Sequence, residues 1–333
     1  MRDSDRDPFP VRHIAEISPT PPEAQWLIEQ LVLALACAII GGAPRCWKTW
    51  LAAELALAVA AGGKALGQYQ ARVSGPVLFY GAEDGLSALK VRFSTLAKAH
   101  RVRLESVPLY LLDVAEVRID SPAHLSRLRR TIEKVKPRLL VLEPFVRLAR
   151  GVDENSATEV SSVLGSLRTI QREYSLAVLI AHHMRKTPSA HLGQQLRGSG
   201  DFAAWSDSGL YLTNTGARRV LRVEHRNAPA PPPVHLELTS GDDAHLAVIG
   251  AQPTASPQDD DPLRAALLDR LSAATRPLMG VELREALKVR NATLLEALKT
   301  LQARGLIVRD AAGGYSFPAN SGGNTAPASQ AVK

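Results

Sequence analysis

A short run near the start of the chain has the residue types and spacing that bind a phosphate group. The pattern G-x-x-x-x-G-K-[ST] is followed, except for Trp47 in place of glycine, by Gly42-Ala43-Pro44-Arg45-Cys46-Trp47-Lys48-Thr49. In such a loop the backbone amides and the N-terminus of the following helix attract an anion. Lys48 would neutralise the β- and γ-phosphates and the Thr49 hydroxyl would hold Mg²⁺. We therefore expect residues 42–50, Trp50 included, to bind ATP with Mg²⁺.

Trp47 stands where a glycine lets the backbone approach the phosphates closely. We expect a side chain to fit here only if its φ is negative and its Cβ points away from the nucleotide. The alternative interpretation of the run is a Pro/Gly turn before an amphipathic helix that happens to carry Lys-Thr.

Two apolar runs end in carboxylates, which is where ligands bind in an open α/β sheet. Val77–Tyr80 leads into Gly81-Ala82-Glu83-Asp84, and Leu139–Leu142 leads into Glu143. Glu83 is the candidate to polarise the attacking water, with Asp84 as a helix cap. Glu143 has the position of a Walker B carboxylate for Mg²⁺, one methylene longer than the usual Asp. The alternative for Glu83 and Asp84 is a pair of N-cap acids.

A third apolar run, Ala177–Ala181, ends in His182-His183, and a polar residue at this position could contact the γ-phosphate. The segment 184–200 that follows is basic, and in a nucleic-acid motor its Arg185, Lys186 and Arg197 would face the bound strand. The alternative is an ordinary surface loop.

Arg222 and Arg226 lie in a late basic strand and its exit. Either arginine would suit a finger that reaches a neighbouring subunit's γ-phosphate, and a solvated basic face is the alternative. On a strand, Arg222 and Glu224 share one face, and Arg219 and Leu221 share the other.

The elements that position these residues alternate between strand and helix, which predicts a mainly parallel sheet flanked by helices. The expected strands are 36–41, 76–80, 108–112, 138–142, 177–181 and 208–212. The expected helices are 49–61, 85–100, 121–134 and 157–174. Residues 219–224 and 234–238 are expected to add antiparallel strands.

Composition shifts predict five segments along the 333 residues. We expect an N-terminal arm at 1–22, an α/β nucleotide-binding domain at 23–239, a linker at 240–261, a small domain at 262–318 and a disordered tail at 319–333.

The small domain is expected to contain helices at 263–274, 281–288 and 291–304, followed by a β-hairpin, and it resembles a winged helix. Leu294, Leu295, Leu298 and Leu301 are expected on the apolar stripe of its last helix. In a DNA-binding version that helix would enter the major groove, and its candidate contacts are Arg290, Asn291, Thr293, Lys299 and Arg304. The alternative is a winged helix used for protein contact or oligomer assembly.

Charge and cysteine content indicate which kind of partner and which cellular compartment to expect. The net charge is +7 and the sequence pI is near 9.6, which suits a polyanionic partner such as nucleic acid. The two cysteines, Cys37 and Cys46, do not form a disulfide framework or a metal-ligand pattern. The opening residues lack a secretory signal, and the longest apolar run, 31–40, is too short to span a bilayer. We expect a cytoplasmic protein that does not associate with membranes.

As a set, these motifs resemble the RecA-like AAA_25 ATPases, the group that includes plasmid RepA-type hexameric replicative helicases. The resemblance covers about residues 26–238. It includes 42–49, 80–84, 139–144, 152–155, 182–186, 197–200, 205–208 and 225–229. It implies a RecA-like core that binds ATP and Mg²⁺ at subunit interfaces of a homo-oligomer such as a hexamer. The carried-over roles are phosphate and Mg²⁺ binding for Lys48 and Thr49, catalysis for Glu83, Walker B for Glu143 and the switch for His183.

The sequence therefore favours an ATPase that acts on DNA, gripping a single strand in a ring, a duplex through the winged helix, or both. One alternative is a nucleotide-gated DNA-binding regulator with little turnover, suggested by Trp47 and Glu143. The other is a small-molecule kinase, which would need a lid and an acceptor site that the sequence does not clearly contain.

Overall fold

The computed structural model describes residues 11–18, 21–184, 192–196, 200–215, 218–249, 262–272, 274, 276–287, 289–303, 307–310 and 313–316. The chain divides into two compact units near residue 251. In the described part of the chain, no helix has the length and apolar character needed to cross a membrane.

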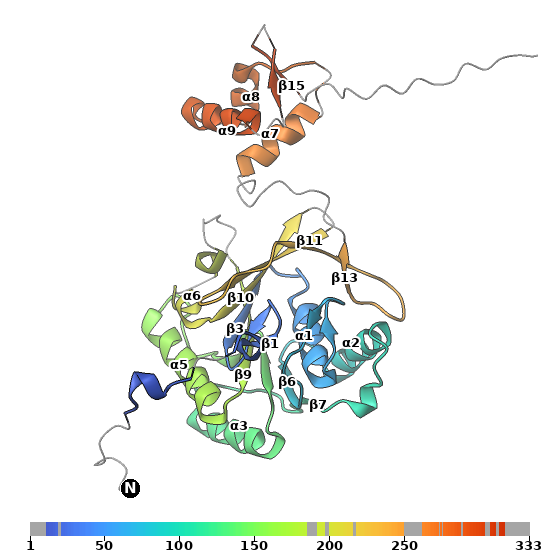
Figure 1. The fold of residues 1–333 in the computed structure, drawn as a ribbon, viewed down its shortest axis with the longest axis vertical. Helices are drawn as coiled ribbons and strands as arrows, with labels where there is room; N and C mark the ends of the chain where they lie inside the picture. Colours follow the sequence, from blue (N-terminus) through green and yellow to red (C-terminus); the bar gives the residue numbers. More distant parts are fainter. Residues whose placement is uncertain are drawn as a thin grey trace, which may run out of the picture. The chain divides into compact units, whose positions relative to one another are not determined.

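The first unit is built on a nine-stranded sheet with the order β13-β12-β11-β10-β3-β9-β8-β6-β7 (Figure 1). The six strands from β10 to β7 are parallel, and β11, β12 and β13 continue the sheet in antiparallel fashion. This architecture confirms the predicted α/β class. The strands are β3 (Cys37–Gly42), β6 (Val77–Gly81), β7 (Leu109–Leu111), β8 (Leu139–Glu143), β9 (Ala177–His183), β10 (Ser208–Thr215), β11 (Arg218–His225), β12 (Val234–Leu238) and β13 (Leu246–Ile249).

Helices cover both faces of this sheet (Figure 1). One buried cluster joins the sheet to α1 and α2, and a second joins the opposite face to α3 and α5. Central strands such as β3 and β8 are buried along their whole length, as expected where helices pack on both faces. The helices are α1 (Lys48–Ala61), α2 (Leu86–Ala99), α3 (Pro122–Val135), α4 (Phe145–Leu148), α5 (Ala157–Tyr174) and α6 (Asp201–Trp205).

Short elements complete the first unit. They include two small hairpins, β1 (Trp26–Ile28) with β2 (Val32–Leu33) and β4 (Lys64–Ala65) with β5 (Tyr69–Gln70). Four 3₁₀ turns are η2 (Ile14–Glu16), η3 (Pro22–Gln25), η4 (Leu104–Ser106) and η5 (Leu192–Gln195).

The sheet extends further along the chain than the sequence predicts. The boundary expected at residue 239 is too early, because β13 at Leu246–Ile249 pairs with β12. The turn between them is closed by Thr239, whose backbone amide donates to the His245 carbonyl over 2.9 Å and whose hydroxyl accepts from the His245 amide over 2.9 Å. The expected linker at 240–261 therefore contains the last strand of the sheet.

The second unit has the predicted order of three helices and a hairpin: α7 (Pro262–Ser272), α8 (Gly280–Leu287), α9 (Asn291–Ala303), β14 (Val308–Arg309) and β15 (Tyr315–Ser316). Its core includes Leu283, Leu294, Leu298 and Leu301. Leu295 is exposed, contrary to expectation, because the buried positions 294, 298 and 301 follow i, i+4, i+7 and residue 295 is turned about 100° away from that line.

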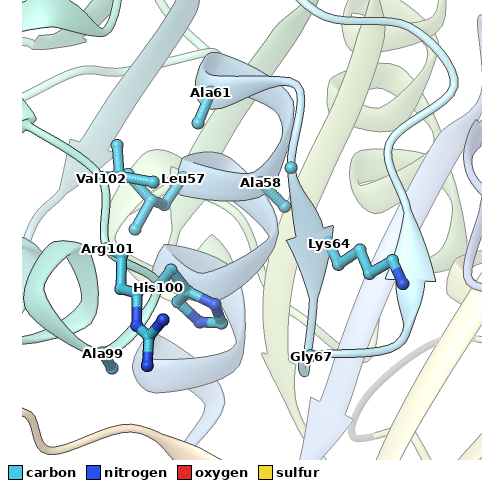
Figure 2. A pocket seen from close by; sticks show the side chains of 10 residues that line it. Leu57, Ala58, Ala61, Lys64, Gly67, Ala99, His100, Arg101 and Val102 are labelled. Carbon is cyan, nitrogen blue, oxygen red and sulfur yellow. The ribbon is translucent and has the colours of Figure 1, made fainter.

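A pocket of about 350 Å³ lies at the C-terminal ends of α1 and α2, lined by Leu57, Ala58, Lys64, His100, Arg101 and Val102 among others (Figure 2). Helix α1 has 14 residues, so this pocket is about 20 Å from the N-terminus of the helix, where the predicted phosphate loop lies. It is separate from the nucleotide site that the sequence predicts.

Near this pocket an acidic side chain is buried inside α1. The Glu54 side chain is almost fully buried, and its carboxylate accepts a hydrogen bond from the Leu66 amide (2.7 Å) and pairs with Nε2 of His100 (2.8 Å). The hydrogen bond to Glu54 raises the pKa of His100 above 6.5 despite the opposing effect of burial.

The first prediction concerns this pair. Because the folded-state pKa of His100 is raised, its stabilising contribution is complete below about pH 6.5 and is lost as the pH rises through the folded-state pKa. His100→Gln should lower the free energy of unfolding by roughly 1–2 kcal/mol at about pH 6, and by less at about pH 9. Urea unfolding at several pH values measures the difference. A deficit that does not change with pH would show that the contact is not ionic.

Candidate nucleotide-binding site

The phosphate loop connects the end of β3 to the start of α1, as the sequence predicts. At Gly42 a Cβ would collide with Sγ of Cys46, which is packed under the loop, and would crowd the Leu212 carbonyl oxygen at 3.1 Å. Trp47 is the N-cap of α1 and makes no side-chain hydrogen bond to the helix, and no acidic residue lies in the first turn. The positive end of the helix dipole is thus available to an anion.

Trp47 has φ 70° and ψ 25°, so the expected negative φ is wrong. The loop retains the left-handed conformation that glycine normally supplies, at a cost of about 1–2 kcal/mol for a residue with a Cβ. The guanidinium of Arg219 on β11 lies 4.4 Å from the centroid of the Trp47 ring. A cation–π contact of this kind contributes about 0.5–1 kcal/mol at an exposed site and more when desolvated, which offsets part of the backbone cost.

Lys48 is directed into the curve of the loop. Its ammonium donates to the carbonyl oxygens of Ala43 (2.9 Å) and Gly42 (3.2 Å), and it lies 3.4 Å from Nδ1 of His183 at the end of β9. The structure therefore brings together two of the predicted site residues from positions 135 residues apart. The ammonium lies where it would meet a phosphate held by the loop amides.

Thr49 and Glu143 meet at the start of α1. The Thr49 hydroxyl donates a hydrogen bond to Oε1 of Glu143, and Glu143 is almost fully buried at the end of β8. Burial raises the pKa of this carboxyl to about 7, although the Thr49 hydrogen bond and the Lys48 charge act in the opposite direction.

These two side chains fit a magnesium site. Within the described part of the chain, Oε2 of Glu143 is buried without a hydrogen-bond partner. A hydroxyl and a carboxylate at a phosphate loop are the oxygen ligands that Mg²⁺ takes together with water and substrate phosphates. The described residues contain no cluster of three or more His, Cys, Asp or Glu that would form an all-protein metal site, so the phosphates would complete the coordination.

The two adjacent histidines have different surroundings, as expected for neighbours on a strand. His183 faces Lys48. His182 is buried, stacked on Phe202 with ring centroids 4.0 Å apart and edge-on to Phe145 at 5.6 Å. His182 therefore anchors β9 to α4 and α6, and His183 alone reaches the loop.

Glu83 lies on the loop after β6, the strand that pairs with β8. Its side chain is about half exposed and lies 3.4 Å from Nε of Arg147. Asp84 is not a helix cap, because the N-cap of α2 is Gly85 and the α2 N-terminus has no side-chain cap. Instead Asp84 forms an ion pair with Arg92, whose guanidinium lies 5.2 Å from the Trp50 ring centroid.

Of the two candidate fingers, Arg226 is held inside the subunit. It donates to the carbonyl oxygens of Ala204 and Ser206 and lies 3.5 Å from the Asp207 carboxylate. Arg222 is half-buried on β11, opposite Tyr211 of β10.

The predicted DNA-binding residues are only partly described. Arg185, Lys186, Arg197 and Arg304 lie outside the described residues. Arg290, Asn291, Thr293 and Lys299 are exposed on α9 or just before it. The described part of the 184–200 segment is tied to the sheet, because Glu224 of β11 accepts hydrogen bonds from the amides of Leu192 (3.1 Å) and Gly193 (3.3 Å).

Sequence reasoning missed the pairing of Arg219 with Trp47 and of Arg92 with Trp50. The signal for both was a tryptophan on each side of Lys48-Thr49, since a large aromatic ring beside a polar loop needs a partner that covers it.

The strand order and the loop between β3 and α1 define an α/β domain of the P-loop type. The AAA_25 family, an AAA domain, matches residues 5–189, and the chain belongs to this family.

Among solved structures, the chain is similar to the RadB recombinase, with 16% identity and a TM-score of 0.48 over 65% of this chain and 92% of that one. It is also similar to a DnaB-like replicative helicase that was studied with primase, with 15% identity and a TM-score of 0.48 over 65% of this chain and 58% of that one. A search of curated proteins gives no match.

The second prediction concerns Glu143. Its folded-state pKa of about 7 exceeds the ordinary value of 4.5, so the folded state binds more protons between these values and stability falls as the pH rises through them. Glu143→Gln removes this penalty. The variant should therefore exceed wild type in the free energy of unfolding by roughly 1–3 kcal/mol at about pH 8, and by little at about pH 4.5. Denaturant unfolding without nucleotide tests this, and parallel pH profiles for the two proteins would contradict it.

Proposed function

We propose that this protein binds ATP with Mg²⁺, hydrolyses it, and acts on DNA as a RecA-like homo-oligomer. The observation that supports this most is the meeting of Lys48, Thr49, His183 and Glu143 at one loop. His183 and Glu143 come from the neighbouring strands β9 and β8, and Lys48 and Thr49 come from the start of α1.

The roles follow from position. Lys48 binds the β- and γ-phosphates, and Thr49 with Glu143 holds the metal ion. Mg²⁺, when bound, would neutralise phosphate oxygens and leave the γ-phosphorus open to attack. His183, which contacts the Lys48 ammonium, would respond when the γ-phosphate is lost.

Glu83 is proposed to orient the attacking water. It lies on the loop that follows β6, the strand next to β8, and its carboxylate is accessible, which a general base for water requires. Its contact with Arg147 is long and exposed, so it contributes little energy and yields readily to a substrate.

The two arginines after β10 have different proposed roles. Arg222 is proposed as a finger toward a neighbouring subunit, in a ring such as a hexamer. Arg226 would have to give up its contacts with Ala204, Ser206 and Asp207 to act in this way, so we assign it to the support of that segment.

DNA binding is proposed at two places. The basic segment with Arg185, Lys186 and Arg197 would contact a single strand, and α9 of the winged-helix-like unit would contact a duplex. The net charge of +7 and the exposed Arg290 and Lys299 favour this proposal. The alternative for this unit is protein contact or oligomer assembly.

A second candidate function is a nucleotide-gated DNA-binding regulator with little turnover. It is favoured by Glu143, because a carboxyl with a pKa of about 7 is partly protonated at neutral pH and then binds a metal weakly.

The third prediction separates these two functions. Glu83→Gln should bind ATP as wild type does, but phosphate release should fall by roughly a hundredfold or more, because the variant cannot accept a proton from water. Phosphate release is measured with Mg²⁺-ATP alone, with single-stranded DNA and with duplex DNA.

Glu105→Gln, on the exposed η4 turn, is the matched control, and Lys48→Ala should abolish ATP binding. An unchanged kcat for Glu83→Gln would move the catalytic role elsewhere. ATP binding by wild type without turnover under every condition would select the regulator.

The fourth prediction tests α9. The double substitution Arg290→Glu and Lys299→Glu should weaken duplex binding by about tenfold or more and reduce its salt dependence, while ATP affinity is unchanged. Fluorescence anisotropy of a labelled duplex at two salt concentrations measures this. Arg284→Glu, which changes an exposed side chain on α8, controls for net charge. Undiminished duplex binding would assign the unit to protein contacts.

A further inference from the structure

The β10–β11 hairpin runs past the end of β3 and continues alongside the phosphate loop. Strand β10 pairs with β3 up to Leu212 and Gly42, where β3 ends. Beyond that point β10 and β11 still pair with each other, with Asn214 opposite Arg219. This hairpin therefore places side chains next to the loop on the side away from His183 and Glu143, since β9 and β8 flank β3 on its other edge.

Arg219 uses this position to reach the loop. Its guanidinium lies 4.4 Å from the ring centroid of Trp47, and its Nη1 donates to the Arg218 carbonyl over 2.9 Å. A planar guanidinium that stacks on an aromatic ring keeps its N–H groups directed outward in the plane, where they can bind an oxyanion. Trp47, the residue that departs from the loop motif, thus packs against the guanidinium of Arg219.

The charge of Arg219 is felt within the loop itself. The pKa of the Cys46 thiol is raised by burial, and the Lys48 and Arg219 charges oppose this rise, Lys48 more strongly. Two cations from different elements therefore act on one loop atom. A second cation would stabilise a triphosphate bound at this loop, because the ligand carries several negative charges.

We propose that Arg219 is a phosphate-binding residue of the same subunit, held at the loop by the Trp47 ring. This rests on the proposed function, since it adds a cation to the nucleotide site. It also gives the tryptophan at the glycine position a role: the ring is the platform that orients the guanidinium. The ligand class is a nucleoside triphosphate or diphosphate, and Arg219 would discriminate these from a monophosphate.

The test is equilibrium binding of ATP, ADP and AMP to the full-length protein by isothermal titration. Arg219→Ala should weaken ATP binding by about tenfold, the usual effect of losing a charged hydrogen bond, and AMP binding by much less. Arg219→Lys keeps the charge without the planar fork and should give an intermediate ATP affinity. Arg218→Ala, an exposed neighbour on the same strand, is the matched control and should bind as wild type does.

Trp47→Gly should retain the loop conformation, because glycine adopts φ 70° without strain. It should weaken ATP binding about as much as Arg219→Ala, and the double variant should be no weaker than either single one, since the two side chains act together. Additive losses would overturn the platform role of Trp47.

Unchanged ATP affinity in Arg219→Ala, with binding abolished in Lys48→Ala, would overturn the inference alone. Absence of ATP binding by wild type would overturn both the inference and the proposed function. A loss that is equal for ATP and AMP would show that Arg219 supports the loop without contacting the phosphates.

Discussion

The register of three adjacent parallel strands is the constraint on which the site depends. Gly41 pairs with His182 and Gly42 with His183, so β3 and β9 end side by side, and β8 ends next to them. This alignment brings the Lys48 ammonium to the His183 ring and the Thr49 hydroxyl to the Glu143 carboxylate. A shift of one residue in β9 would direct His182 to the loop and insert His183 among Phe145 and Phe202, which would place a different side chain in contact with each partner. The aromatic packing of His182 therefore helps to hold the register that the loop requires.

Burial is the second constraint, and it acts differently on the two acidic groups near the loop. Glu143 ends a fully buried strand, so its carboxyl is desolvated and its pKa is raised to about 7. Glu83 follows the neighbouring strand but extends into solvent. The two carboxyls thus differ in environment as their proposed roles require, a buried group for the metal ion and an exposed group for water.

Much of the fold could be predicted from the sequence, because its strands and helices have clear and different periodicities. The positions of α1, α5 and β12 agree with expectation to within a residue. Lys48, Thr49 and Glu143 were predicted from a loop motif and the end of an apolar run, and His183 from the family resemblance, and the structure brings these four side chains together. The φ of Trp47 was wrong, since a backbone conformation forced by the loop overrides the preference of the residue. Strand β13 was missed because it is short and lies in a polar segment. The partners of Asp84, Arg92 and Arg219 depend on side-chain directions in three dimensions, which linear spacing does not contain.

Strand β11 links two parts of the molecule. It carries Arg219 beside the phosphate loop and, five residues later, Glu224, which holds the amides of Leu192 and Gly193. Five residues of extended chain span about 17 Å, and over this length β11 pairs with β10 throughout and with β12 from Arg219 to Leu221. One strand thus joins the Trp47 side of the loop to the Leu192–Gln195 turn, through a side chain at each end.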